Sequence, residues 1–320
     1  MEDHAKKVLQ RRFASFVTQR GPFRTLIETA DIFRSRGWTV FAFGGAPRGV
    51  YDNGNRYSPR DIDLVFDDEH FEYFESAFGN YVLRRNSYGG LRLKVKGLMM
   101  DAWPLSATWA FREGHIASPS FESLPSTTFL NIDGIVIEVV PAKGKSRRIY
   151  ECGFFTGWRE RTLDINLRKN PHPGICVART LHIASRFNFQ LSYRLAVYLW
   201  EMLRHLSLSA LETAQTKHYG KVEFAAPVLL RLRNRLERHL DSNAQGPIWP
   251  FTKKQMEFDP QAFNLPAMAE QATQERGASR TADDYEDMVM QWLFEDTDSL
   301  RRSIHRSGGK SGRDCVRDPA

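Results

Sequence analysis

The sequence predicts an α+β fold in which an N-terminal sheet domain precedes an all-helical body. Apolar residues recur at three- and four-residue steps in residues 1–36 and again after about residue 160, which is typical of amphipathic helices. Between these regions, short apolar or alternating runs are separated by Gly-Gly, Asp-Gly and proline, which indicates strands and turns. The predicted parts are N-terminal helices at 1–36, a sheet domain at 37–158, a helical neck and body at 159–240, a loop-rich segment with a C-terminal helix at 241–304, and a basic tail at 305–320.

The elements of the predicted sheet domain follow one another along the chain. The N-terminal helices are indicated by Val8, Phe13, Phe16, Val17, Phe23, Leu26, Ile27, Ile32 and Phe33. Residues 71–78 follow three acidic residues and predict a helix between strands. The predicted strands are 38–43, 61–66, 81–85, 91–96, 99–103 and 135–140.

Helical spacing dominates the second half of the chain. Apolar residues fit amphipathic helices at 177–187, 195–203 and 228–240. Residues 241–282 have little pattern and are rich in Pro, Gly, Gln and Ala, which predicts loops. A last helix is predicted at 282–304 before the Gly- and Arg-rich tail.

Size and composition restrict the class of protein. At 320 residues the chain is long enough for about two domains. No apolar stretch approaches the roughly 20 residues that cross a bilayer, and the N-terminus lacks the apolar segment of a signal peptide. Cys152, Cys176 and Cys315 have no C-x-x-C spacing, which argues against a disulfide framework or a zinc site. We therefore expect a cytoplasmic protein without a membrane partner.

Positive charge is concentrated in the predicted helical body. The formal net charge is +7, and residues 175–240 hold ten Lys and Arg against four Glu and no Asp. This excess predicts a polyanionic partner such as RNA, with Arg231 and Arg235 as candidate contacts. Solvated helix faces are the alternative interpretation. A basic loop at 143–148 allows the same two interpretations.

A glycine turn is the first part of a candidate active site. Gly44 and Gly45 directly follow the apolar run at 38–43, so the turn is expected at a strand end. Because glycine has no Cβ, backbone N–H groups at this turn can approach phosphate oxygens. The cationic Arg48 follows within one helical turn. We therefore predict that Gly44, Gly45 and Arg48 bind the triphosphate of a nucleotide.

Carboxylates on neighbouring strands form the second part of the candidate site. Side chains alternate along a strand with period two, so Asp61 and Asp63 are expected to point the same way. Two such carboxylates repel each other unless a cation lies between them, and Mg²⁺, or Mn²⁺ in its place, is the expected cofactor. A third acid, Asp101, lies in the apolar run at 98–103. Three acids on adjacent strands suit nucleotidyl transfer, whereas solvated aspartates on a surface strand are the alternative.

Taken in order, these motifs resemble the bacterial class II tRNA CCA-adding enzyme and poly(A) polymerase family, within the polymerase-beta-like nucleotidyltransferase superfamily. In that family a Gly-Gly-x-x-Arg turn precedes an Asp-x-Asp strand. Here Tyr-Gly-Gly-Leu at 88–91 resembles the stretch that leads into the third acidic strand. Residues 178–189 resemble the family's neck helix, Leu-Arg-Ala-x-Arg-Phe-Ala-x-x-x-x-Phe. The residues that match the first motif are Gly44, Gly45, Arg48, Asp61 and Asp63, and the resemblance covers residues 38–205.

The sequence departs from the family at two motifs. Family members carry Arg-Arg-Asp-Phe-Thr-Ile-Asn after the third strand, whereas 126–131 here read Ser-Thr-Thr-Phe-Leu-Asn. The Glu-Asp-x-x-Arg motif that reads the incoming base falls on 173–176, which has neither the Asp nor the Arg. Loss of a paired acid and guanidinium removes groups that distinguish cytosine from adenine, so CCA specificity is not expected to follow from the resemblance.

The resemblance implies a polymerase-beta-like sheet domain, a helical neck and body, and a nucleoside triphosphate substrate. The implied reaction transfers a nucleoside monophosphate to a hydroxyl, most readily at an RNA 3′ end such as that of tRNA, and releases pyrophosphate. Asp61, Asp63 and Asp101 are then the catalytic metal ligands, Arg179 contacts the nucleotide and Arg186 contacts RNA. The alternatives are the same chemistry on a protein, a small molecule or a tRNA in a toxin or defence role, and an inactive RNA-binding relative.

Overall fold

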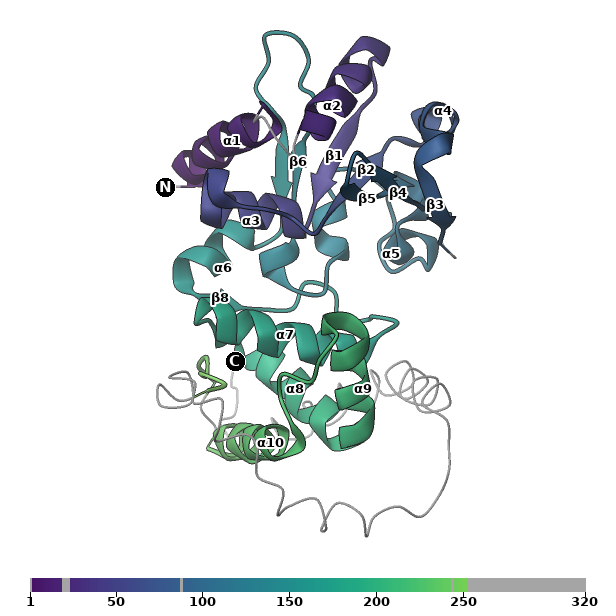
Figure 1. Ribbon diagram of the computed structural model, residues 1–320. Helices are drawn as coiled ribbons and strands as arrows, with labels where there is room; N and C mark the ends of the chain where they lie inside the picture. The colour runs from purple at the N-terminus through teal and green to yellow at the C-terminus, as the bar shows by residue number, and fades with distance from the viewer. Residues whose placement is uncertain (1, 19–23, 87–88, 243–244, 252–320) are drawn as a thin grey trace, which may run out of the picture.

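The computed structural model describes residues 2–18, 24–86, 89–242 and 245–251 (Figure 1). The resemblance at Tyr88, the predicted helix at 282–304, the tail at 305–320 and Cys315 lie outside the described residues, as does most of the loop-rich segment. Within the described ranges, no helix is both long and apolar enough to span a bilayer.

A seven-stranded mixed sheet forms the N-terminal half, and its central strands carry the candidate carboxylates. Strand β2 lies between β1 and β5, parallel to β5 and antiparallel to β1. The order across the sheet is β3-β4-β5-β2-β1-β6-β7. The strands are β1 Val40–Phe43, β2 Asp61–Phe66, β3 Val82–Arg85, β4 Leu91–Val95, β5 Leu98–Pro104, β6 Ile135–Glu138 and β7 Ile149–Glu151.

Helices surround this sheet and then form a separate helical layer below it in Figure 1. The helices of the first half are α1 Glu2–Thr18, α2 Arg24–Arg36, α3 Gly45–Asn53, α4 Asp68–Phe78, α5 Trp109–Arg112 and α6 Phe154–Glu160. Those of the second half are α7 Pro173–Phe187, α8 Tyr193–His205, α9 Leu208–Tyr219 and α10 Ala226–Asp241. A short parallel pair, β8 Thr162–Leu163 and β9 Gln190–Leu191, joins the two halves. The predicted α+β class is confirmed, although β7, β8, β9, α5, α6 and α9 were not predicted as separate elements.

The two faces of the sheet differ in what covers them. On one face, Phe66 of β2 packs against Phe33 of α2 and Phe74 of α4, with ring centroids 5.2 and 4.3 Å away. On the other face a smaller apolar cluster contains Phe41 of β1 and Val65 of β2. Because strand side chains alternate, Asp61 and Asp63 share the face of Val65. The candidate carboxylates therefore lie on the less heavily covered face.

Candidate functional site

Four side chains form a row across one face of the sheet. The strand register pairs Phe43 with Asp63, Asp63 with Asp101, and Asp101 with Arg92. Asp61 stands two residues before Asp63 and so shares this face. The expectation that these carboxylates point the same way is confirmed by the register.

Arginine side chains already accompany these carboxylates. Arg60 Nη2 lies 3.0 Å from Asp61 Oδ2, and Arg92 Nη2 lies 3.5 Å from the same oxygen. Arg92 Nε also lies 3.7 Å from Asp101 Oδ1. As these side chains are placed, no group of three His, Cys, Asp or Glu residues in the described part of the chain is close enough to hold a metal ion. The donor set itself, three carboxylates, suits a hard divalent cation that displaces the arginines.

Asp63 is a buried carboxylate whose negative charge is disfavoured by its surroundings. Burial raises its pKa to about 7, and the neighbouring charges of Asp61 and Asp101 act in the same direction. The pKa of Asp101 is also raised by burial, although Arg92 opposes this shift. A carboxylate with this environment is stabilised in its ionised form by a bound cation.

This pKa predicts how the metal-free protein responds to pH. The folded state keeps a proton on Asp63 that the unfolded chain releases between its ordinary pKa of 3.8 and the folded value of about 7. Stability is therefore expected to fall as pH rises through that window. Asp63→Asn cannot ionise, so it should melt several degrees above wild type at pH 8, and the gap should narrow as the pH falls and close only as the pH approaches 3.8. Thermal melts in a chelating buffer measure this; a gap that does not change with pH contradicts the assigned environment.

The glycine turn lies beside this row and opens α3. Gly44 has a φ of 61°, a left-handed conformation that favours glycine, and its N–H donates to Ile135 O at 3.0 Å. A Cβ added to Gly45 would meet no protein atom within 4 Å, so protein packing does not require glycine there. The first turn of a helix leaves backbone N–H groups without helical partners and attracts anions. The predicted phosphate-binding turn is thus open at Gly45.

Asp133 organises the arginines of the site, and sequence reasoning missed it. This carboxylate is buried and pairs with both Arg48 of α3 and Arg179 of α7, whose Nε donates to Asp133 Oδ2 at 2.8 Å. Burial by itself would raise the pKa of Asp133, but Arg179 and Arg48 more than offset it, so the pKa lies below its usual value. Asp133 follows the mainly apolar residues 129–132, which suggests that it is buried, and a buried acid needs a cationic partner. This pattern was the sequence signal that could have identified Asp133.

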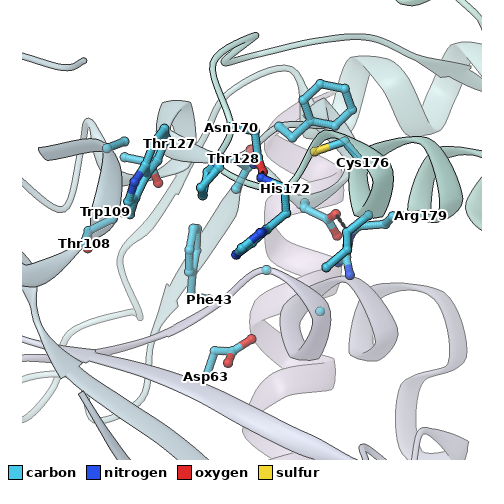
Figure 2. Close-up of a pocket in the computed structure, with 17 residues that line it drawn as sticks. Phe43, Asp63, Thr108, Trp109, Thr127, Thr128, Asn170, His172, Cys176 and Arg179 are labelled. Carbon is cyan, nitrogen blue, oxygen red and sulfur yellow. Dashed lines mark hydrogen bonds and ion pairs between the residues drawn. The ribbon is translucent and has the colours of Figure 1, made fainter. Parts of the chain in front are cut away.

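A pocket of about 360 Å³ connects these groups (Figure 2). Asp63 and the glycine turn lie on the sheet side, and His172 and Arg179 lie on the helical side. The remaining polar wall comes from Asn170 and from the hydroxyls of Thr108, Thr127 and Thr128, with Trp109 beside them. Cys176 also lines the pocket, and burial raises its pKa to about 12, so the thiol is neutral at pH 7.

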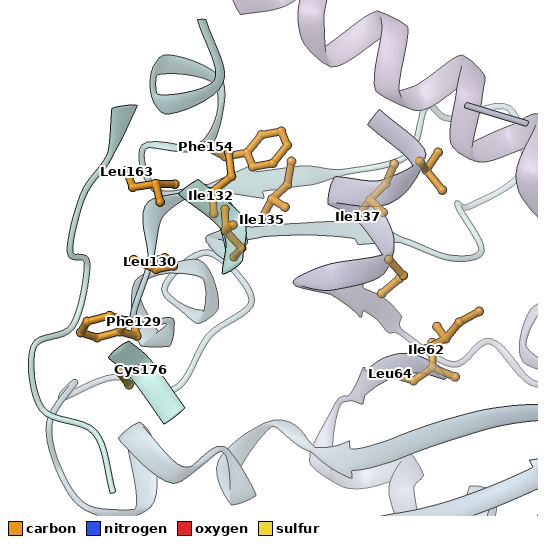
Figure 3. Packing of buried hydrophobic residues seen from close by; sticks show 14 of the residues in the cluster. Ile62, Leu64, Phe129, Leu130, Ile132, Ile135, Ile137, Phe154, Leu163 and Cys176 are labelled. Carbon is orange, nitrogen blue, oxygen red and sulfur yellow. The ribbon is translucent and has the colours of Figure 1, made fainter. Parts of the chain in front are cut away.

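A continuous apolar core fixes the two sides of the pocket relative to each other (Figure 3). The same cluster contains Ile62 and Leu64 behind the carboxylates and Phe129 and Cys176 at the pocket wall. It continues through Leu181 of α7 into the helical layer. Such close-packed interiors resist relative displacement, so Arg179 is held at the sheet by packing as well as by its ion pair.

The three arginines predicted to contact RNA lie at different distances from the pocket. Arg186 lies close to the arginine cluster, because its guanidinium and that of Arg48 are 5.4 and 6.0 Å from the centroid of the same Phe187 ring. Arg231 and Arg235 lie on α10, which packs against α8 and forms the end of the helical layer away from the sheet (Figure 1). The structure therefore brings Arg48, Arg179 and Arg186 together but not Arg231 and Arg235.

The fold of this chain is similar to that of solved CCA-adding enzymes. A CCA-adding enzyme in complex with CTP has a TM-score of 0.52 and 16% identity, with 96% of this chain and 70% of that chain covered. The Thermotoga maritima CCA-adding enzyme in complex with tRNA has a TM-score of 0.51 and 13% identity, with 95% and 75% covered.

The likeness has limits in sequence and in length. An apo form of a CCA-adding enzyme has a TM-score of 0.50 and 16% identity, with 76% of this chain and 57% of that chain covered. Among similar structures, this chain spans only 56–66% of the length of several. No protein-family model and no curated protein matches the sequence. At these identities the likeness establishes the fold.

Proposed function

We propose that this chain is a divergent, metal-dependent nucleotidyltransferase of the polymerase-beta-like superfamily. It transfers a nucleoside monophosphate from a nucleoside triphosphate to a hydroxyl group of RNA and releases pyrophosphate. The observation that carries the proposal is the pairing of Asp63 with Asp101 across parallel strands, with Asp61 on the same face and the open glycine turn beside them. Clustered negative charge destabilises a fold, and a bound cation would relieve the repulsion that raises the pKa of Asp63.

The residues of the site have separate roles in this reaction. Gly45 at the start of α3 and the cationic Arg48 and Arg179 orient the triphosphate and neutralise its charge. Asp61, Asp63 and Asp101 would hold Mg²⁺, which when bound lowers the pKa of the attacking hydroxyl and neutralises the phosphates. The hydroxyl oxygen attacks the α-phosphorus, and the bond from that phosphorus to the bridging oxygen breaks. Asp133 holds both arginines in place before the substrate arrives.

The base of the triphosphate is expected to meet the wall opposite Asp63. This wall contains the amide of Asn170 and the imidazole of His172. It also contains the hydroxyl oxygens of Thr127 and Thr128, whose O–H groups already donate to Leu124 O at 2.7 Å and to Pro125 O at 2.9 Å, so these oxygens serve as acceptors. The Oδ1 of Asn170 accepts a hydrogen bond from the backbone N–H of His172 at 2.9 Å, so the side-chain amide of Asn170 offers its N–H groups to a base. In this proposal the Asn170 amide and the His172 imidazole contact the base in place of the acid and guanidinium that residues 173–176 lack.

RNA is the proposed acceptor because two observations support it. The chain is strongly basic, with a pI near 9.3, and two of the structures with the same fold are CCA-adding enzymes in complex with CTP and with tRNA. A protein or small-molecule acceptor is the second candidate, because the base-reading motif of the resembled family is absent from 173–176. Arg231 and Arg235, remote from the pocket, are proposed to contact the body of the RNA rather than its 3′ end.

Gly45→Ala is expected to separate nucleotide binding from folding. The added methyl group meets no protein atom, so stability should stay within about 0.5 kcal/mol of wild type. It would occupy the space through which phosphate oxygens approach the turn, so triphosphate affinity should fall about tenfold or more. Gly79→Ala is the matched control, because its Cβ also meets no atom within 4 Å and it lies outside the pocket. Titration calorimetry with a non-hydrolysable triphosphate measures both; equal affinities of the two variants would remove the turn from the nucleotide site.

The acceptor is tested by supplying Mg²⁺ and each α-³²P-labelled triphosphate in turn, together with total RNA, protein extract or small-molecule extract. The proposal predicts that label enters RNA, and the preferred triphosphate then identifies the base that the pocket accepts. Label found only in protein or in small molecules would support nucleotidyl transfer but would contradict RNA as the acceptor. No label in any of the three fractions would favour an inactive RNA-binding relative.

A further inference from the structure

A second cavity, of about 560 Å³, lies on the sheet domain between α1 and the loop that joins β6 to β7. This loop rises beside α1 at the top of Figure 1. Helix α1 contributes Lys7, Gln10 and Arg11, and the loop contributes Lys145 and Arg147. No acidic residue lines the cavity among the residues that the structure describes. We call this feature the basic groove.

Contacts between α1 and the β6–β7 loop hold the two walls of the basic groove together. Gln10 Nε2 donates a hydrogen bond to Arg147 O at 2.7 Å, which joins the loop to the helix. The Arg147 guanidinium lies 5.9 Å from the centroid of the Phe13 ring, and Phe13 is buried in the main core. The opposite face of α1, with Leu9 and Phe13, packs inward, which leaves Lys7 and Arg11 at i and i+4 on the groove side.

The charges of the groove are not neutralised, unlike those of their neighbours. Lys6 pairs with Glu2 at 2.7 Å, and Arg148 pairs with the buried Glu138 at 2.8 Å. Among the described residues, no ion pair is found for Lys7, Arg11 or Lys145. The Nε of Arg147 is buried and has no hydrogen-bond partner in the same described part of the chain. Three cations in one hollow, Lys7, Arg11 and Lys145, therefore have no ion pair among the described residues, whereas Arg147 is partly engaged because its Nη2 donates to Val139 O at 3.4 Å.

We infer that the basic groove binds the phosphate backbone of an RNA strand. Separate cations along two walls match a row of phosphates, since Lys and Arg side chains neutralise successive phosphates without reading bases. A membrane surface fits less well, because none of the large apolar side chains exposed in the described chain lines the groove.

The groove lies away from the glycine turn. Strand β6 runs antiparallel to β1, with Val136 opposite Phe43 and Glu138 opposite Phe41, so the β6–β7 loop leaves the sheet at the end opposite Gly44. The two ends of β1 are about 10 Å apart. The position of the RNA rests on the RNA acceptor of the proposed function. The groove contacts a part of that RNA away from the reacting 3′ end.

The experiment measures the affinity of the full-length protein for a fluorescent tRNA-sized RNA, without triphosphate, over a range of salt concentrations. The groove variant is Lys7→Gln/Arg11→Gln/Lys145→Gln. The control variant, Lys6→Gln/Arg24→Gln/Lys143→Gln, removes the same charge from side chains that do not line the groove. The groove variant should bind at least about tenfold more weakly near 0.1 M salt, with a salt slope smaller by about three. The control should stay within about twofold of wild type.

Equal weakening of the two variants, or none in either, would overturn the inference. The inference would also be overturned if the groove variant bound vesicles of anionic phospholipid more weakly than wild type but bound RNA with unchanged affinity. That result would assign the groove to a membrane surface. Because binding is measured without triphosphate, the result does not depend on catalysis. Failure of the groove therefore leaves the proposed reaction untouched, and absence of label transfer leaves the groove measurement interpretable.

Discussion

Asp133→Ala is expected to lower the free energy of unfolding by about 3–5 kcal/mol, the largest stability change predicted for the site. The carboxylate is buried, and its removal leaves Arg48 and Arg179 close to each other without a counter-charge. The two arginines come from the sheet domain and from the helical layer, so the variant should also loosen the contact between them. Chemical denaturation at pH 7 measures the change.

The control for this prediction is an exposed ion pair. Arg194 pairs with Asp164 at 2.6 Å, but the Arg194 side chain is 69% exposed, so Arg194→Ala should cost less than about 1 kcal/mol. If Asp133→Ala costs no more than Arg194→Ala, Asp133 is not the counter-ion that organises the site.

Asp61→Asn and Asp63→Asn are each expected to reduce nucleotidyl transfer by about a thousandfold or more. Amides keep the shape of the carboxylates but not the negative charge, so they bind a divalent cation poorly. Loss of one preorganised charge at a reacting centre commonly costs a factor of about 10²–10³. Rates of label transfer at saturating triphosphate measure the effect.

Stability and activity should move in opposite directions for Asp63. The same Asp63→Asn substitution that abolishes transfer is expected to stabilise the metal-free protein above pH 7, because burial, Asp61 and Asp101 disfavour its charge. An inactive variant that folds better than wild type cannot owe its inactivity to unfolding. Asp52→Asn, at an exposed position on α3, is the control and should retain full activity. Undiminished transfer in both Asp61→Asn and Asp63→Asn would exclude the assigned site.

Local patterns were sufficient to predict the part of the site that lies within one strand. Period-two alternation places Asp61 and Asp63 on one face whatever the neighbouring strands are. The pairing with Asp101 and the position of Arg92 depend on the register of β2, β5 and β4, which no single segment encodes. The sequence therefore predicted that the three acids lie on neighbouring strands, but it did not predict Arg92 beside them.

Residues assembled from distant segments could not be predicted in the same way. Asp133 and Arg179 are 46 positions apart, and only the packing of α7 against the sheet brings them together. Helix α9 was missed because it buries few side chains, namely Leu211, Ala214 and Gln215, so its apolar periodicity is weak. The pocket wall of Thr127, Asn170 and His172 has no motif of its own, since it exists only where loops from both halves meet.

The most direct test of the central claim is the stoichiometry of the reaction with RNA. Pyrophosphate release and incorporation of labelled nucleoside monophosphate into RNA should be measured together for wild type and for Asp61→Asn/Asp63→Asn. The account predicts one pyrophosphate for each nucleotide incorporated by wild type, and neither product from the variant. Release of inorganic phosphate without incorporation, or equal incorporation by the variant, would contradict nucleotidyl transfer at this site.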